Sequence, residues 1–224
     1  MPRHLSCVVS MQKPLVCFQL NLLWKADDFD DIISFVFFTI LIIATVKMGG
    51  NMVRPDEVKV KAQRLGEQNY KFRAFLKNRA DRDELDAKFL KLHNEMFAVF
   101  DCCKCTNCCK AFSIILDNGE IKKIAASLGM IENDFITEYL ANADLDDEKP
   151  YKIKEMPCSF LLSDGRCRIQ DCKPDVCAEF PFTNQPDRLL RLYSIIGHAE
   201  ICPVVFEMLE RLKGMYGFRN WVRK

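Results

Sequence analysis

Residues 102–109 read CCKCTNCC, and this stretch determines how the rest of the chain is interpreted. Five of its eight residues are cysteines, in a chain with 12 cysteines among 224 residues. Four of them follow the spacing C-x-x-C-x-x-C-C: Cys102, Cys105, Cys108 and Cys109. A gap of two residues lets two thiolates of one turn face a single metal, as zinc and iron–sulfur sites require. The alternative is a run of inert thiols packed as small apolar residues, but chain neighbours seldom face the same way. The stretch therefore predicts metal binding.

The second half of the predicted site lies further along the chain. Residues 159–162 and 167–170 read as two short strands joined by the turn residues 163–166, which predicts a β-hairpin with Cys158 and Cys167 at its ends. Pro174 presets a helical turn that carries Cys177. Finally, Cys202 precedes a proline and an amphipathic helical pattern.

Composition and charge narrow the classes of function. A chain of 224 residues with 49% hydrophobic and 28% charged residues is typical of one globular domain, or of one domain with an appendage. A net charge of +1 excludes a general electrostatic attraction to nucleic acid or anionic lipid. With only three histidines, sulfur must supply most of any coordination sphere. His198, four residues before Cys202, is the histidine that best suits a ligand.

The first 51 residues have a different character from the rest. Residues 32–46 are a continuous apolar run of fifteen residues, whereas a membrane-spanning helix needs about 20. Acidic residues precede the run where a signal peptide would carry basic ones, and no typical cleavage site follows. Residues 49–52, GGNM, can be encoded by GGAGG followed closely by ATG, which resembles a bacterial ribosome-binding site. Residues 1–51 are therefore interpreted as a mis-assigned start, a membrane-associated segment or, as a third alternative, a signal peptide.

The remaining pattern predicts a mainly helical α+β protein. Residues 52–100 form a helical arm, in which Pro55 begins one helix and Asp81 caps a second. The apolar stripe of that second helix contains Leu85, Phe89, Leu92, Met96 and Val99. Residues 101–224 are predicted to form a small, metal-centred, cysteine-cluster domain with a short β-hairpin, and a helix over 120–128 that ends at Gly129.

The cysteine motifs, taken together, resemble the YkgJ-type cysteine cluster proteins, a family of zinc- or iron-chelating domains. The resemblance covers residues 102–202. It departs from the family at Lys173, where arginine is usual, and at Gln170, where an aromatic residue is common. Cys103 and Cys172 fall outside the pattern. The segments that carry the resemblance are Cys102-x-x-Cys105-x-x-Cys108-Cys109, Cys158-Ser159-Phe160-Leu161, Gly165-Arg166-Cys167-Arg168-Ile169 and Lys173-Pro174-x-x-Cys177-x-x-Phe180-Pro181-Phe182.

The resemblance implies a metal site and leaves the identity of the metal open. Eight thiolates can fill two tetrahedral Zn²⁺ sites, or hold one or two [4Fe–4S] clusters. The C-x-x-C-x-x-C run favours iron–sulfur, with a distant cysteine, Cys177, as the fourth ligand. The metal ligands implied by the family pattern are Cys102, Cys105, Cys108, Cys109, Cys158, Cys167, Cys177 and Cys202.

Three classes of function stay open at this point. The first is a metal-binding protein whose cluster is structural or redox-active, and the second is a structural interaction module with two zinc ions. The third is an iron–sulfur oxidoreductase or a protein-modifying enzyme similar to flagellin lysine-N-methylases, which carry a similar cysteine-rich module. The expected partner is a metal ion or cluster, with no nucleic acid and with any protein partner or electron donor undefined. The chain is expected to be cytoplasmic, or membrane-associated if residues 32–46 are translated.

Overall fold

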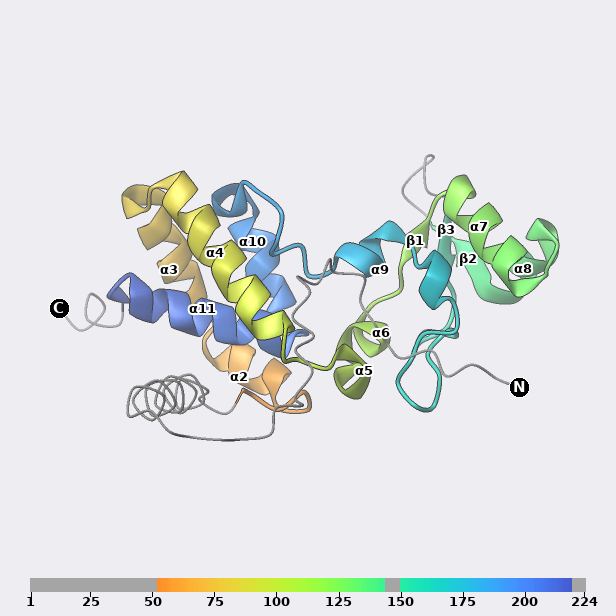
Figure 1. Ribbon diagram of the computed structural model, residues 1–224, viewed down its shortest axis with the longest axis horizontal. Helices are drawn as coiled ribbons and strands as arrows, with labels where there is room; N and C mark the ends of the chain where they lie inside the picture. The colour runs from red at the N-terminus through yellow and green to blue at the C-terminus, as the bar shows by residue number, and fades with distance from the viewer. Residues whose placement is uncertain (1–51, 144–149, 219–224) are drawn as a thin grey trace, which may run out of the picture. The chain divides into compact units, whose positions relative to one another are not determined.

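The computed structural model describes residues 52–143 and 150–218 (Figure 1). The chain divides into two compact units, Met1–Met52 and Val53–Lys224. The predictions for residues 1–51, including the apolar run 32–46, lie outside the described residues. Within the described ranges, no helix is both long enough and apolar enough to cross a bilayer.

Five helices of the second unit pack as a bundle (Figure 1). They are α2 (Val58–Arg64), α3 (Gly66–Arg79), α4 (Arg82–Phe97), α10 (Arg188–His198) and α11 (Pro203–Met215). Helix α10 packs against α3 and α4, while α11 packs against α2, α4 and α10. The centre of the bundle contains fully buried large side chains, among them Phe72, Phe89 and Leu212, and burial of each stabilises the fold by about 1.5–3 kcal/mol. The predicted arm therefore packs against helices from the other end of the chain.

Helix α4 shows how far periodicity predicts burial. Its predicted cap is confirmed, because the Asp81 carboxylate accepts a hydrogen bond from the backbone N–H of Glu84 at 2.9 Å. Leu85, Phe89, Leu92 and Met96 are buried as expected. Val99 is 82% exposed. It lies beyond Phe97, where the helix ends, so the helical spacing no longer places it on the buried face.

A small sheet with two helices forms the second apolar core. Strands β1 (Ile115–Leu116), β2 (Leu140–Asn142) and β3 (Tyr151–Ile153) are antiparallel in the order β1-β3-β2. Helices α7 (Asn118–Leu128) and α8 (Glu132–Tyr139) pack together beside them (Figure 1). Ile121, Phe135 and Phe160 are buried in this core. The chain is thus a mainly helical α+β protein, as its sequence predicts.

The predicted hairpin at 159–170 is reduced to a single β-bridge between Leu161 and Cys167. Backbone hydrogen bonds flank the bridge, from Leu162 N to Arg166 O and from Arg168 N to Phe160 O, both at 2.8 Å. Pairing stops at Ile169, whose φ of −104° and ψ of 36° are not extended. The 3₁₀ helix η1 (Gln170–Cys172) follows. Ile169 is buried in the second core, and its backbone bends there. Because the bend ends the pairing, the two predicted strands do not form.

Three short helices have no fully buried side chain. They are α5 (Cys102–Cys105), α6 (Asn107–Ala111) and α9 (Asp175–Glu179). In the chain, α5 and α6 connect the bundle helix α4 to strand β1, and α9 lies between η1 and the bundle helix α10. These helices therefore link the two cores, and only the partly buried Val176 and Cys177 of α9 pack against one of them, the sheet core.

Glu120 connects α7 to one of these linking helices. Asp117 and Glu120 form a capping box at the start of α7, with hydrogen bonds of 2.8 and 3.0 Å. The other carboxylate oxygen of Glu120 accepts a hydrogen bond from the backbone N–H of Asp175, the first residue of α9, at 3.1 Å. One buried carboxylate thus holds a helix start and positions α9.

Replacing Glu120 should therefore lower the free energy of unfolding more than replacing its capping partner, Asp117, does. We expect Glu120→Ala to lower the free energy of unfolding by about 2 kcal/mol, since it removes two hydrogen bonds to a charged acceptor. Asp117→Ala, which removes its capping bond and leaves the bond to Asp175 in place, should cost about 1 kcal/mol. Urea unfolding of the two variants measures the difference. Equal losses would show that the hydrogen bond to Asp175 contributes nothing.

Candidate metal centre

The CxxCxxCC stretch forms two short helices with a sharp change of direction between them. The Asp101 carboxylate caps α5 by accepting a hydrogen bond from the Cys103 backbone N–H at 3.0 Å. Thr106, between α5 and α6, has a left-handed conformation with φ 54°, an uncommon one for a residue other than glycine. Cys108 and Cys109 follow on α6 with their Sγ atoms 3.9 Å apart. The turn at Thr106 thus lets two helices present thiols from one eight-residue stretch.

The loop 163–166, which follows Leu162 and precedes Cys167, lies directly against α5. Gly165 has φ +82°, and a Cβ atom built on it would lie 1.9 Å from the Cys103 carbonyl oxygen. Only glycine accommodates both this φ and this approach. The close contact places the segment that carries Cys158 and Cys167 beside the tandem cysteines.

The four downstream cysteines occupy defined positions. The Cys158 backbone N–H donates a hydrogen bond to the Cys109 carbonyl oxygen at 2.8 Å, and Cys167 forms the bridge with Leu161. Cys177 lies in α9, which begins after Pro174 as predicted. Cys202 is buried at the start of α11, with Pro203 as the first helical residue.

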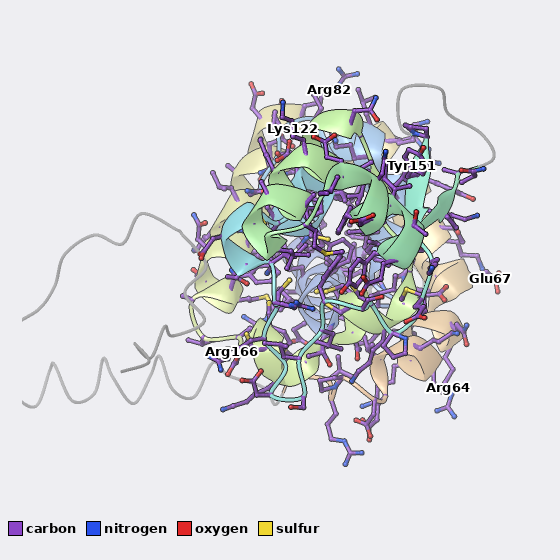
Figure 2. All side chains as sticks on the ribbon, turned by 90° about the vertical axis from the view of Figure 1, so that its right-hand side faces the viewer. Arg64, Glu67, Arg82, Lys122, Tyr151 and Arg166 are labelled. Atoms are coloured by element: carbon purple, nitrogen blue, oxygen red, sulfur yellow. The ribbon has the colours of Figure 1, made fainter. Side chains whose placement is uncertain are left out.

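Five cysteines of the family pattern, two from the CxxCxxCC stretch and three from downstream, line one cavity of about 70 Å³: Cys108, Cys109, Cys158, Cys167 and Cys177. Its other walls are largely apolar and include Phe112, Phe160 and Phe180. The Phe180 ring contacts that of Phe112, at 5.4 Å between centroids. Sulfur atoms are visible near the middle of the view in Figure 2.

Lys173 also lines this cavity, and sequence reasoning did not select it. Its positive charge lowers the pKa values of Cys109, Cys167 and Cys177 and so opposes the effects of burial. A metal bound by four thiolates carries excess negative charge, which a nearby ammonium group offsets. The signal was present in the sequence, as the basic residue before Pro174.

Burial and mutual repulsion keep most of these thiols protonated. Burial, followed by the charges of Cys109, Cys158 and Cys167, raises the pKa of Cys177 to about 12. Burial likewise raises the pKa of Cys202 to about 12. The hydrogen bond between Cys108 and Cys109 lowers the pKa of Cys108, whereas that bond and burial raise the pKa of Cys109. Metals bind thiolates, so loading this site releases protons.

The donor set fits a soft metal, because sulfur ligands select zinc and iron–sulfur clusters. Among residues 52–143 and 150–218, no three Cys, His, Asp or Glu side chains are placed so that they could hold one ion. The structure thus defines which thiols are neighbours, without a formed coordination sphere.

The histidines take part in other contacts. The His198 ring lies beside Phe180 and Phe182, with centroids 5.1 and 5.9 Å away, and its Nδ1 atom is buried without a hydrogen-bond partner. His93 is buried in α4 with Nδ1 2.9 Å from the Thr183 hydroxyl. Both imidazole rings thus contact residues of the segment 180–183, which follows α9. Neither histidine is among the predicted metal ligands.

His93 should make stability depend on pH. Burial, and then the charge of Arg188, lower the pKa of His93, whereas an unfolded histidine has a pKa of about 6.5. The unfolded chain therefore binds a proton first as pH falls below about 6.5, and stability is lost. We expect the melting temperature of wild type to fall more between about pH 7 and 5.5 than that of His93→Gln. Parallel melting curves would contradict this.

Comparison with known proteins supports the chemistry of this site. Residues 101–203 match the model of the family CxxCxxCC, described as "Putative zinc- or iron-chelating domain". This is the family that the cysteine motifs resemble, and it indicates a metal-chelating domain without deciding between zinc and iron. No curated protein and no solved structure matches the chain.

Proposed function

Starting from the CxxCxxCC domain at residues 101–203, we propose that this chain is a metal-binding protein whose thiolate-held metal joins the helical bundle to the sheet core. The metal is structural in this proposal: it fixes the linking segments that carry the cysteines. Residues that would hold it are the eight cysteines of the family pattern. When bound, the metal supplies strong bonds to sulfur that cross-link distant parts of the chain.

The observation that carries the proposal is the absence of fully buried side chains in α5, α6 and α9. Cys102, Cys105, Cys108, Cys109 and Cys177 all lie on these three helices. Helices this short are marginal in water and depend on packing for their stability. Because no residue of these three helices is fully buried and only Val176 and Cys177 pack against a core, another source of stability is needed there. Metal–thiolate bonds provide one, as they do in small zinc domains.

The cavity supports an inorganic occupant. Pockets for organic ligands usually measure about 300–1,000 Å³, while the cavity beside the thiols measures about 70 Å³. Its polar lining consists of the thiols, Ser113 and Lys173. An ion or a small cluster suits this space better than a nucleotide or another organic cofactor, which favours the metal-binding function over an enzymatic one.

We further propose an iron–sulfur cluster in preference to zinc. Cys102, Cys105 and Cys108 have the spacing C-x-x-C-x-x-C, in which successive thiolates can take three corners of one cubane, as in bacterial ferredoxins. Zinc sites more often combine separate C-x-x-C pairs. The spacing is the reason for this choice, and zinc is the alternative.

The test is the metal content of the full chain purified without oxygen. Iron with acid-labile sulfide and a broad visible absorption is the expected result. Zinc in a colourless protein would replace the iron–sulfur assignment and keep the metal-binding function. Protein without either metal would contradict the proposal. Cys105→Ser should lose metal, while Cys172→Ser, outside the family pattern, is the matched control and should retain it.

A further inference from the structure

We propose that the eight cysteines form two separate four-sulfur sites. The first site consists of Cys102, Cys105, Cys108 and Cys202, and the second of Cys109, Cys158, Cys167 and Cys177. This inference rests on the proposed metal-binding function and specifies its ligands. It also differs from the expectation that Cys177 completes the C-x-x-C-x-x-C run, since that ligand is now Cys202.

The first site is held together by Asn107. Its side-chain amide donates hydrogen bonds to the carbonyl oxygens of Pro55 at 2.7 Å and of Ile201 at 3.1 Å. Ile201 immediately precedes Cys202, so this contact holds the start of α6 against the start of α11. Cys105 and Cys108 are within two residues of Asn107 on either side. The polar anchor therefore brings Cys202 to the tandem cysteines, although 94 positions separate Asn107 from Ile201.

The second site is organised by a different set of contacts. The Cys158 backbone N–H donates a hydrogen bond to the carbonyl oxygen of Cys109 at 2.8 Å. The β-bridge between Leu161 and Cys167 holds Cys167 beside the segment that begins at Cys158. All four thiols of the second site line the 70 Å³ cavity, and of the first site only Cys108 does. Lys173, at this cavity, supplies a charge of the opposite sign.

Cys108 and Cys109 mark the boundary between the two sites. They are consecutive residues of α6, and consecutive side chains of an α-helix point about 100° apart. Their sulfur atoms are 3.9 Å apart, a distance that two ligands of one tetrahedral zinc ion also show, at about 3.8 Å for Zn–S bonds of about 2.3 Å. The division therefore rests on the cavity, which Cys109 lines together with Cys158, Cys167 and Cys177, and it gives each cysteine of the pair a place as a ligand.

The test uses the full chain, stripped of metal under reducing conditions and reloaded with Zn²⁺ alone. Since one zinc ion takes four thiolates, wild type should bind about two ions. Cys202→Ser should bind about one, and alkylation followed by mass spectrometry should find Cys109, Cys158, Cys167 and Cys177 protected and Cys102 and Cys105 reactive. Cys167→Ser should give the reverse pattern. Cys172→Ser, the control, should match wild type.

Several outcomes would overturn the division. One is loss of both ions in Cys202→Ser; another is protection of Cys102 and Cys105 in that variant together with exposure of Cys177. If wild type binds zinc but only as a single ion, the division fails while the metal-binding function stands. If it binds neither zinc nor iron, the function itself fails. Circular dichroism of the bundle helices monitors folding, and Cys105→Ser with Cys158→Ser provides a second pair of variants, one for each site.

Discussion

Removing the metal from the folded protein is expected to unfold α5, α6 and α9 while the helical bundle keeps its structure. These three helices have no fully buried side chain, whereas the bundle has its own core of fully buried residues such as Phe72, Phe89 and Leu212. Binding of structural zinc contributes about 10 kcal/mol or more in small zinc domains. An effect of that size exceeds the total stability of many domains.

Hydrogen exchange with and without a chelator measures this effect segment by segment. Amide protection should disappear in residues 102–111 and 170–179 and persist in α4 and α11. The Cys172→Ser variant, treated in the same way, should behave like wild type. Full retention of protection in α5 and α6 after the metal has gone would show that these helices do not depend on it. Loss of protection throughout the bundle would show that the two cores do not unfold separately.

The second largest effect is expected from Gly165→Ala. The new Cβ atom would meet the Cys103 carbonyl oxygen at 1.9 Å, and the residue would keep a φ of +82°. Backbone cannot retreat as a flexible side chain can, so the loop 163–166 must move away from α5. We expect a loss of more than about 3 kcal/mol in the free energy of unfolding, in the upper range for single substitutions. Metal affinity should fall as well, because Cys167 lies two residues away.

Gly129→Ala is the matched control for this variant. Gly129 also has a left-handed backbone, with φ +68°, but a Cβ atom there would meet no atom within 4 Å. It should cost only the strain of the left-handed conformation, about 1–2 kcal/mol, and leave metal content unchanged. Urea unfolding and metal analysis of both variants separate the two contributions. Equal losses of stability would mean that the contact with Cys103 is not a constraint.

Local features of this fold could be predicted because their causes lie within a few residues. Asp81 caps α4 through an amide three positions along the chain. Gly129 ends α7 with φ 68°, as its place after Leu128 predicts. The stripe from Leu85 to Met96 is buried, and it fails at Val99 only because the helix has ended.

Features that depend on contacts between residues far apart in the chain could not be predicted from the sequence as well. The strands predicted at 159–162 and 167–170 contract to one bridge, because the burial of Ile169 in the sheet core accompanies a bend that ends the pairing. The packing of α10 and α11 on the first helices has no signature in residues 52–100. Lys173 could be recognised in the sequence as a departure from the family motif. Only the structure shows that its positive charge lies beside the thiols of the cavity.

The sequence alone indicated the chemistry of this protein: the C-x-x-C-x-x-C-C run and the cysteines that follow it predict thiolate ligation of a metal, because ligand type and short spacing are properties of the chain itself. Only the tertiary structure decided which of the thiols are neighbours. Cys202 is brought to the tandem cysteines by hydrogen bonds of Asn107, and Cys158 is brought to Cys109 by a backbone hydrogen bond. Contacts between residues tens of positions apart depend on how both cores pack, and no local pattern encodes that.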